Sequence, residues 1–464
     1  MKIKGSRLWA SSGFLVCSGI LALGIAQAYW RGAPDFSVFY QAGRLVLEGR
    51  GLEIYRVSPD RFLYGPGFAW LFSPIAVFPR PWALALWCAA KVMVCVGMAW
   101  GLGQAYQRKS PLRDGGVFWG LLFWSCVFIA RPLLIDFYYG QVNLMVLGAC
   151  VWALLRHHED HEGHLGHPGH PGHEEWVIGS ARSSSLGALS GASSQISAHP
   201  SWSGESKAPL QESIKDGLSF TLLTWAALSK LFPLPLLLLP WLPFQRVSSR
   251  KRRSEQLGIV LGVFSLLGVL QFSVGWEGLF SLLMQWKEAL LLKGLPLESH
   301  NQSFTALLYH YFSGQPTPVI AEGGRLFTLG WQSLSQAQIQ AISGVWTLTW
   351  MALILGWLCA HSRVEHLRWM AILIGLLILP SYLIWKPYFV MTLPLAIFIL
   401  HWSVLKRSLG LGLAWVVLFF VFNLSGFDFV GHQAATYLES ASVLLLVHVA
   451  LMLITVALPQ LKTR

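Results

Sequence analysis

The stretch Pro34-Asp35-Phe36-Ser37-Val38-Phe39-Tyr40 comes directly after the first strongly apolar segment of the chain. If that segment crosses a membrane, Asp35 lies where the helix emerges into water. A carboxylate at this position can meet an aqueous molecule and a lipid headgroup at the same time. Asp35 is therefore the first candidate for a functional residue.

Two short elements follow Asp35 before the next long apolar segment. Residues 40–49 have an amphipathic pattern that ends at Gly49, which predicts a helix. Residues 62–74 are apolar but too short, and too often interrupted by proline and glycine, to span a bilayer. We expect this second element to be juxtamembrane or re-entrant and to cover the site that Asp35 opens.

The composition indicates an integral membrane protein made of helices. Apolar residues make up 54% of the chain and charged residues 12%, whereas a soluble domain has about 25% charged residues. The formal net charge of +12 comes from short Lys/Arg clusters between apolar runs, as in cytoplasmic loops, so nucleic acid is not an expected partner. All six cysteines lie inside apolar runs, so no disulfide framework is predicted: Cys17, Cys88, Cys95, Cys126, Cys150 and Cys359.

About 12 membrane crossings, with both termini cytoplasmic, place every Lys/Arg cluster on the inner side. The segment 8–30 resembles a signal peptide but is too long for one, so it is expected to remain as the first span. Two of the crossings are short and broken and fall between residues 212 and 244. The other expected spans are 81–106, 115–133, 138–155, 257–275, 340–360, 369–385, 389–404, 408–424 and 441–458.

The spans divide into two modules separated by a polar insert. Residues 1–155 form an N-terminal transmembrane module with a catalytic outer loop at 31–80, and residues 215–464 form a C-terminal module with an outer loop at 276–338. Residues 156–214 are rich in His, Ser and Gly, and such a composition cannot bury enough apolar surface to fold. We expect a disordered cytoplasmic insert there, without the fixed geometry that a catalytic metal site needs.

Asp35 has two roles that its position alone does not separate. Asp is a preferred N-cap, and a helix that begins at Phe36 would use Asp35 in that way. A carboxylate at the membrane surface can instead act as a general base. Asp136, in the predicted outer turn before the fourth span, is the second candidate base.

Three cations fall near the same outer face in this topology: Arg131, Lys230 and Lys386. Charge within a membrane is costly and usually faces a cavity or a partner, and cations there suit a phosphate group. The alternative is that these long side chains only extend their charged ends to the membrane–water interface and bind no ligand. Lys91 lies deeper and could instead form a pair inside the bundle.

Several polar side chains are candidates for substrate binding. His300 and Asn301 lie in the predicted second outer loop, where they could orient a sugar hydroxyl or pack within the loop. Gln141 and Asn143 begin the fourth span, where their amides could satisfy a bent backbone or contact a ligand.

The motifs together resemble the GT-C superfamily of polyprenyl-phosphate-sugar-dependent glycosyltransferases, and most of all the family 87 mannosyltransferase-like proteins. These motifs are spread over most of the chain in the family's order. The residues that carry the resemblance are Asp35-Phe36-Ser37-Val38-Phe39-Tyr40-Gln41-Ala42-Gly43, Gly49, Tyr55, Tyr64-Gly65-Pro66, Gly140-Gln141-Val142-Asn143-Leu144, Lys230 with the leucine run after it, and Asn301-Gln302-Ser303.

The resemblance implies a GT-C-like bundle in the bacterial cytoplasmic membrane, with its active site facing the periplasm. The implied donor is a sugar, mannose in the related proteins, on a polyprenyl phosphate, and the acceptor is a lipid or a glycan. Asp35 would be the base of an inverting transfer, the three cations would bind the donor phosphate, and the substrate contacts would include Tyr40, Tyr64 and Gln302. Membrane lipids are the other expected partners, and no cofactor is implied.

A multispan transporter or lipid flippase is the alternative from another functional class. Twelve spans, broken helices and embedded charges also suit a transporter. The chain shows no repeat that relates its two halves, and the predicted outer loops 31–80 and 276–338 are long. These two features favour the enzyme.

Overall fold

The computed structural model describes residues 5–56, 62–109, 114–158, 208–242, 247–292, 298–314, 333–359 and 365–459. These residues form sixteen α-helices joined by short turns and 3-10 helices, and they contain no strand. The predicted all-helical class is thus confirmed for the described chain. The His-rich part of the predicted insert lies outside the described residues.

Five helical segments are long and apolar enough to cross a membrane, or up to seven if two bent helix pairs each count as one span. The five are α1 (Ser6–Arg31), α4 (Arg80–Lys109), α9 (Ser249–Leu292), α11 (Gln336–Cys359) and the 3-10 helix η5 (Lys386–Thr392) with α13 (Leu393–Lys406). The bent pairs are α5 (Gly115–Phe128) with α6 (Ala130–Tyr139) and α14 (Leu409–Leu424) with α15 (Phe427–Ser440). A polytopic membrane protein is supported, but 12 spans are not confirmed.

The remaining helices are shorter and fill the spaces between the long ones. The apolar ones are α7 (Asn143–His158), α12 (His366–Leu377) and α16 (Val443–Ala457). The others are α2 (Pro34–Leu47), η1 (Gly51–Glu53), α3 (Pro66–Ala76), α8 (Ala208–Ser229), η3 (Leu234–Trp241) and α10 (Phe304–Phe312).

Two predicted boundaries in the N-terminal half are wrong for identifiable reasons. The segment predicted as one span, 115–133, bends by 66° at the break between α5 and α6. Pro132 accounts for the bend, because in a continuous helix its ring would clash with the carbonyl of Phe128, the last residue of α5. The next helix starts at Asn143, later than predicted, because Gly140 ends α6 in a left-handed conformation (φ 71°).

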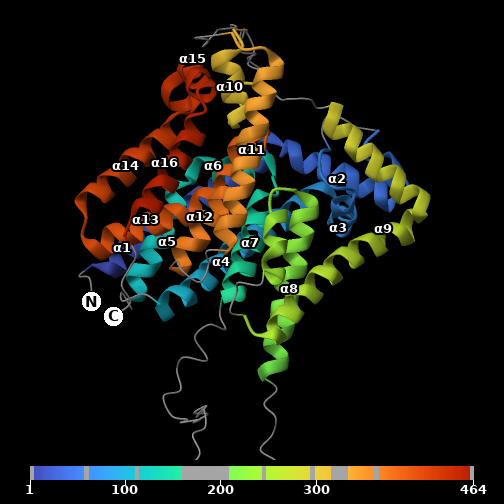
Figure 1. Cartoon of the computed structure of the whole chain (residues 1–464), viewed down its shortest axis with the longest axis horizontal. Coiled ribbons are helices and arrows are strands. Elements are labelled where there is room, and N and C mark those ends of the chain that lie inside the picture. The colour runs from blue at the N-terminus through green and yellow to red at the C-terminus, as the bar shows by residue number, and fades with distance from the viewer. Residues whose placement is uncertain are drawn as a thin grey trace, which may run out of the picture.

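Helices also extend into regions that the sequence predicts to be loops. Helix α7 continues to His158 and α8 begins at Ala208, so both enter the predicted insert. The predicted outer loop 276–338 is still helical as far as Leu292, because α9 breaks at Gly275 (φ 72°, ψ 175°) and then resumes. Figure 1 shows this second part of α9 beside α2 and α3, whereas α10 and α15 lie at the end of the molecule opposite the start of α8.

The predicted orientation, with the polar insert inside and residue 300 outside, can be tested by labelling two engineered cysteines. Ser249→Cys and Ser333→Cys are matched substitutions at exposed positions, and the native cysteines are buried or half-buried. In intact cells, we expect an impermeant maleimide to label Ser333→Cys only, because the Lys/Arg cluster beside Ser249 favours the cytoplasm. Labelling of Ser249→Cys without permeabilisation would show that the orientation is reversed.

Candidate active site

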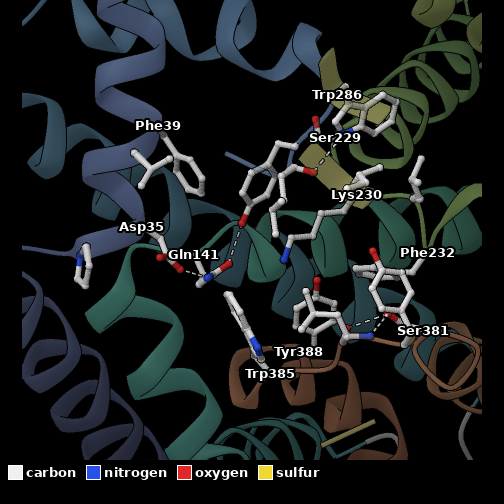
Figure 2. Close-up of a pocket in the computed structure, with 18 residues that line it drawn as sticks. Asp35, Phe39, Gln141, Ser229, Lys230, Phe232, Trp286, Ser381, Trp385 and Tyr388 are labelled. Carbon is white, nitrogen blue, oxygen red and sulfur yellow. Dashed lines mark hydrogen bonds between the residues drawn. The ribbon is translucent and has the colours of Figure 1, made fainter. Parts of the chain in front are cut away.

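A cavity of about 420 Å³ lies where α2, the residues before α3, the turn between α6 and α7, the end of α8 and the segment 381–388 converge. Figure 2 shows Asp35, Gln141 and Lys230 around it, with Trp286 of α9 at its edge. Segments from both predicted modules therefore build one site.

Asp35 is the carboxylate of this cavity, and it is not the N-cap of its helix. Helix α2 begins at Pro34 with Ala33 as the N-cap, and no side chain caps it. The alternative role predicted for Asp35 is therefore wrong, because Pro34 has the backbone angle of a first helical residue and starts the helix earlier. Burial raises the pKa of Asp35 to about 6, although the nearby Lys230 opposes this rise.

Gln141 holds the Asp35 side chain by donating a hydrogen bond from its amide to Oδ2. The contact depends on Gly140, since a Cβ at that position would lie 2.5 Å from Cβ of Phe36. Trp87 fixes the same turn by donating from Nε1 to the Gly140 carbonyl at 2.9 Å. Only glycine thus allows the turn between α6 and α7 to approach α2 so closely.

Tyr64 extends the network to the other wall of the cavity. Its hydroxyl donates to Oε1 of Gln141 at 3.0 Å, so the amide is held at both ends. Gly65 makes the position possible, because a Cβ there would lie 2.2 Å from the carbonyl oxygen of Leu228 near the end of α8. The close approach brings Tyr64 beside Lys230, whose Nζ is 5.3 Å from the centre of the tyrosine ring.

Lys230 is the cation of the cavity and follows the last residue of α8. It is 9% exposed, and its Nζ donates to Oδ1 of Asn143 at 2.7 Å and lies 4.0 Å from the centre of the Tyr388 ring. None of the carboxylates in the described chain forms a salt bridge with it. A buried ammonium with only neutral partners is costly, and an anion in the cavity would remove that cost.

Lys91 and Asp136 form an ion pair inside the bundle, and both side chains are fully buried. Lys91 also donates to the Asp136 carbonyl at 2.7 Å, and that same carbonyl accepts from the backbone N–H of Gln141 at 2.9 Å. The prediction that Lys91 pairs within the bundle is therefore confirmed. Asp136 does not line the cavity, and its pair supports the turn that carries Gln141.

A second polar cluster surrounds Glu439 of α15. Arg131, Lys386 and His300 all contact its carboxylate, at 3.0 Å from Arg131 Nη2 and 2.7 Å from His300 Nδ1. Sequence reasoning missed Glu439. A signal was present, because Glu439 and Asp428 are the only acidic residues after residue 365, and the cations predicted on that face require a counter-charge.

Two of the predicted substrate ligands instead hold the cavity wall. Asn301 and Gln302 are buried, and both bind the segment 382–384. Asn301 donates from Nδ2 to the Tyr382 carbonyl at 3.0 Å. The backbone N–H of Gln302 donates to the Ile384 carbonyl at 2.7 Å. Tyr40 also lies outside the cavity lining and donates to the Phe78 carbonyl at 3.1 Å. Direct substrate contact by these three residues remains a prediction.

No group of three or more His, Cys, Asp or Glu side chains within the described ranges is placed to hold a metal ion. The polar groups that line the cavity or bind its lining residues include the carboxylate, ammonium, amide and phenol described above.

The comparison with family models finds one match, to glycosyltransferase family 87, over residues 62–166. This family is of the GT-C type, so the resemblance drawn from the motifs is confirmed. The match covers less than a quarter of the chain and includes Tyr64, Lys91, Asp136, Gln141 and Asn143, but neither Asp35 nor Lys230. None of the curated proteins matches the chain.

Proposed function

Because its family match indicates a membrane glycosyltransferase, we propose that this protein moves mannose from a polyprenyl-phosphate donor to a hydroxyl group of a lipid or glycan acceptor. The reaction takes place at the outer face of a bacterial cytoplasmic membrane. The observation that carries the proposal is the presence of Asp35 and Lys230 in the same cavity. A base and a cation for a leaving phosphate are the two groups that this reaction requires.

Asp35 removes the proton from the acceptor hydroxyl as its oxygen attacks the anomeric carbon. The bond from that carbon to the phosphate oxygen breaks on the opposite side, so the configuration inverts. The electron pair of this bond leaves with the lipid phosphate. The products are a new glycoside, polyprenyl phosphate and a protonated Asp35, which then releases its proton to water.

The surroundings of Asp35 suit this role. A base whose pKa is raised to about 6 is ionised at neutral pH and accepts a proton more readily than an ordinary carboxylate. Gln141 occupies one carboxylate oxygen and is itself held by Tyr64. The carboxylate is therefore oriented before the substrate arrives, which lowers the cost of reaching the reactive geometry.

Lys230 stabilises the phosphate as it leaves. The phosphodiester of the donor carries one negative charge, whereas the released monoester carries about 1.5 to 2 charges at pH 7. An ammonium at the phosphate thus interacts more strongly with the transition state than with the bound donor. Its neutral partners, Asn143 and the ring of Tyr388, leave its charge available to the ligand.

Arg131 and Lys386 are the other proposed phosphate contacts. Both form an ion pair with the carboxylate of Glu439, so Arg131, Lys386 and Glu439 together carry a net charge of +1. Lys386 adjoins Trp385 of the cavity wall. We propose that this pair adds positive potential next to the cavity, while Lys230 makes the closer contact with the phosphate.

The test is transfer by the purified protein in liposomes supplied with polyprenyl-phosphate mannose or, separately, with a nucleotide-activated mannose. We expect a mannosylated product from the lipid donor alone, and the loss of a lipid-linked or glycan-linked mannose from membranes of cells that lack the protein. Transfer from the nucleotide sugar alone would refute the proposed donor. Movement of the lipid across the bilayer without any transfer would favour the transporter alternative.

A further inference from the structure

The segment 381–388 forms one wall of the active-site cavity, but it is not an α-helix. It lies between α12 and α13, and only its last three residues belong to the 3-10 helix η5. The N–H and C=O groups of such irregular backbone must find partners elsewhere, so its shape depends on contacts with other parts of the bundle. Trp385 and Tyr388 of this wall form the lower edge of the cavity in Figure 2.

Contacts at two points hold this wall. The loop before α10 binds its first half, at residues 382–384. Lys386, in its second half, forms an ion pair with Glu439 of α15. Glu439 is itself fixed, because it is 3% exposed and its carboxylate also binds Arg131 and His300. Glu439 does not line the cavity, so a structural effect of Glu439 on the site passes through the residues that it binds.

Tyr388 connects this anchor to the cation of the cavity. The centre of its ring lies 4.0 Å from Nζ of Lys230. Lys386 and Tyr388 are two residues apart in η5, within one turn of a 3-10 helix, so a displacement of one also displaces the other. The face of an aromatic ring stabilises an ammonium group in a dehydrated site. The position of Tyr388 therefore affects how firmly Lys230 holds its proton.

We propose that Glu439 is a positioning residue, which holds Tyr388 against the ammonium of Lys230 through its ion pair with Lys386. This inference rests on the proposed function, in which Lys230 binds the donor phosphate, and it adds a residue outside the cavity. Arg131 and Lys386 both contact Oε1 of Glu439. Without this carboxylate the two cations repel each other, and Lys386 moves together with the start of η5.

The test follows the protonation of Lys230 by its rate of acylation with acetic anhydride, because only the neutral amine reacts. The rate is measured against pH by mass spectrometry on the purified full-length protein. Burial lowers the pKa of Lys230 to about 7, so the rate in the wild type should rise around that pH. The carboxylates of Asp35 and Asp136 and the ring of Tyr64 also act on this ammonium, and they stay unchanged in every variant. Glu439→Gln should lower the midpoint by roughly one pH unit, the size of a cation–π contact in a dehydrated site.

Lys386→Met distinguishes positioning from a simple effect of charge. It breaks the same ion pair, but it removes a positive charge instead of a negative one. Positioning of Tyr388 predicts a lower midpoint in both variants, whereas a direct effect of charge on Lys230 moves the two midpoints in opposite directions. Opposite shifts, or an unchanged midpoint in either variant, overturn the proposal. Thermal unfolding checks the folding of each variant. If Glu439→Gln does not fold, Lys386→Met decides alone, and an unchanged or raised midpoint overturns the proposal.

Asp428→Asn is the matched control, because Asp428 also lies on α15, is exposed and forms no ion pair within the described ranges. Its midpoint should equal that of the wild type. The proposed function fails by a separate result, in which polyprenyl-phosphate mannose does not slow the acylation of Lys230 in the wild type. The midpoints of the variants would still show whether Glu439 positions Tyr388, so the two failures are distinguishable.

Discussion

Asp35→Asn is expected to lower the rate of sugar transfer by about 10²–10⁴-fold, while the protein still folds and inserts into the membrane. Removal of a general base typically has an effect of this size. Asn keeps the shape of the side chain and can still contact Gln141, but it cannot accept the proton of the acceptor hydroxyl. The measurement is the transfer rate of purified variants at equal protein, with thermal unfolding as the check on folding.

The structural cost of this substitution is small because Asp35 does not cap α2. Its negative charge in the first turn interacts with the helix dipole, which is worth about 0.3–1 kcal/mol. Asp35→Ala is therefore expected to lose transfer as Asn does, without the added stability defect that the loss of a cap would cause. Asp114→Asn is the control, because Asp114 caps α5 away from the cavity and Asn also caps well.

Retention of most of the transfer rate in Asp35→Asn would contradict general-base catalysis in this cavity. Asp136, the second candidate from the sequence, could not take over, because it is buried against Lys91 and does not line the cavity. Asp35 is the only carboxylate among the described residues that does so. The experiment therefore tests the mechanism itself as well as the choice of residue.

The pH dependence provides a second measurement of the same role. A base must be deprotonated to act, and burial raises the pKa of Asp35 to about 6. The transfer rate at low substrate should therefore fall about tenfold per unit well below pH 6. It should also fall above about pH 7, because burial lowers the pKa of Lys230 to about 7 and the neutral amine no longer attracts the phosphate. If the transfer rate instead begins to fall only near pH 4, the base is an ordinary, solvated carboxylate.

The features of the fold that the sequence predicts correctly are those set by local composition. Long apolar runs predict α1, α4 and α11 closely, because a span needs about 20 apolar residues whatever its neighbours are. The bend caused by Pro132 was not predicted, nor was the continuation of α9 beyond Gly275, where the predicted span ends. Apolar content alone does not show whether a helix runs straight or turns at such a residue.

Several residues of the cavity could be predicted from their motifs, but their position next to one another could not. Asp35, Tyr64, Gln141 and Lys230 were all named from the sequence, and the structure brings them together from four separate segments. Glycines at 65 and 140 allow these segments to approach one another, but a glycine does not indicate which segment it will meet. The pairing of Arg131 and Lys386 with Glu439 was missed because residues so far apart in the chain are joined only by the packing of the folded bundle.

Lys230→Met is expected to weaken the binding of a polyprenyl-phosphate sugar by roughly 10–150-fold, which corresponds to the 1.5–3 kcal/mol of a hydrogen bond to a charged group. Met keeps the length and the apolar stem of lysine, so it can still pack against the ring of Tyr388. The amide oxygen of Asn143 loses its donor, but the cavity contains room for water to replace it. Donor affinity is measured by competition with a labelled lipid phosphate.

Lys215→Met is the control, because Lys215 lies on α8, the helix that ends just before Lys230, is 44% exposed and pairs only with the exposed Glu212. It should bind the donor as the wild type does. Equal affinity of Lys230→Met and Lys215→Met for the donor would remove Lys230 from the phosphate site.

Two further results distinguish a phosphate ligand from a residue that only shapes the cavity. The negative charge on the phosphate grows as it leaves, so Lys230→Met should weaken the binding of the released polyprenyl phosphate more than the binding of the donor. For the same reason the substitution should lower kcat as well as raise KM. Lys230 also lowers the pKa of Asp35 by its charge. Its removal should therefore move the acidic limb of the rate profile above pH 6, because Asp35 then holds its proton to higher pH. This shift tests the charge of Lys230 beside Asp35, whereas the larger loss of affinity for polyprenyl phosphate tests its contact with the phosphate.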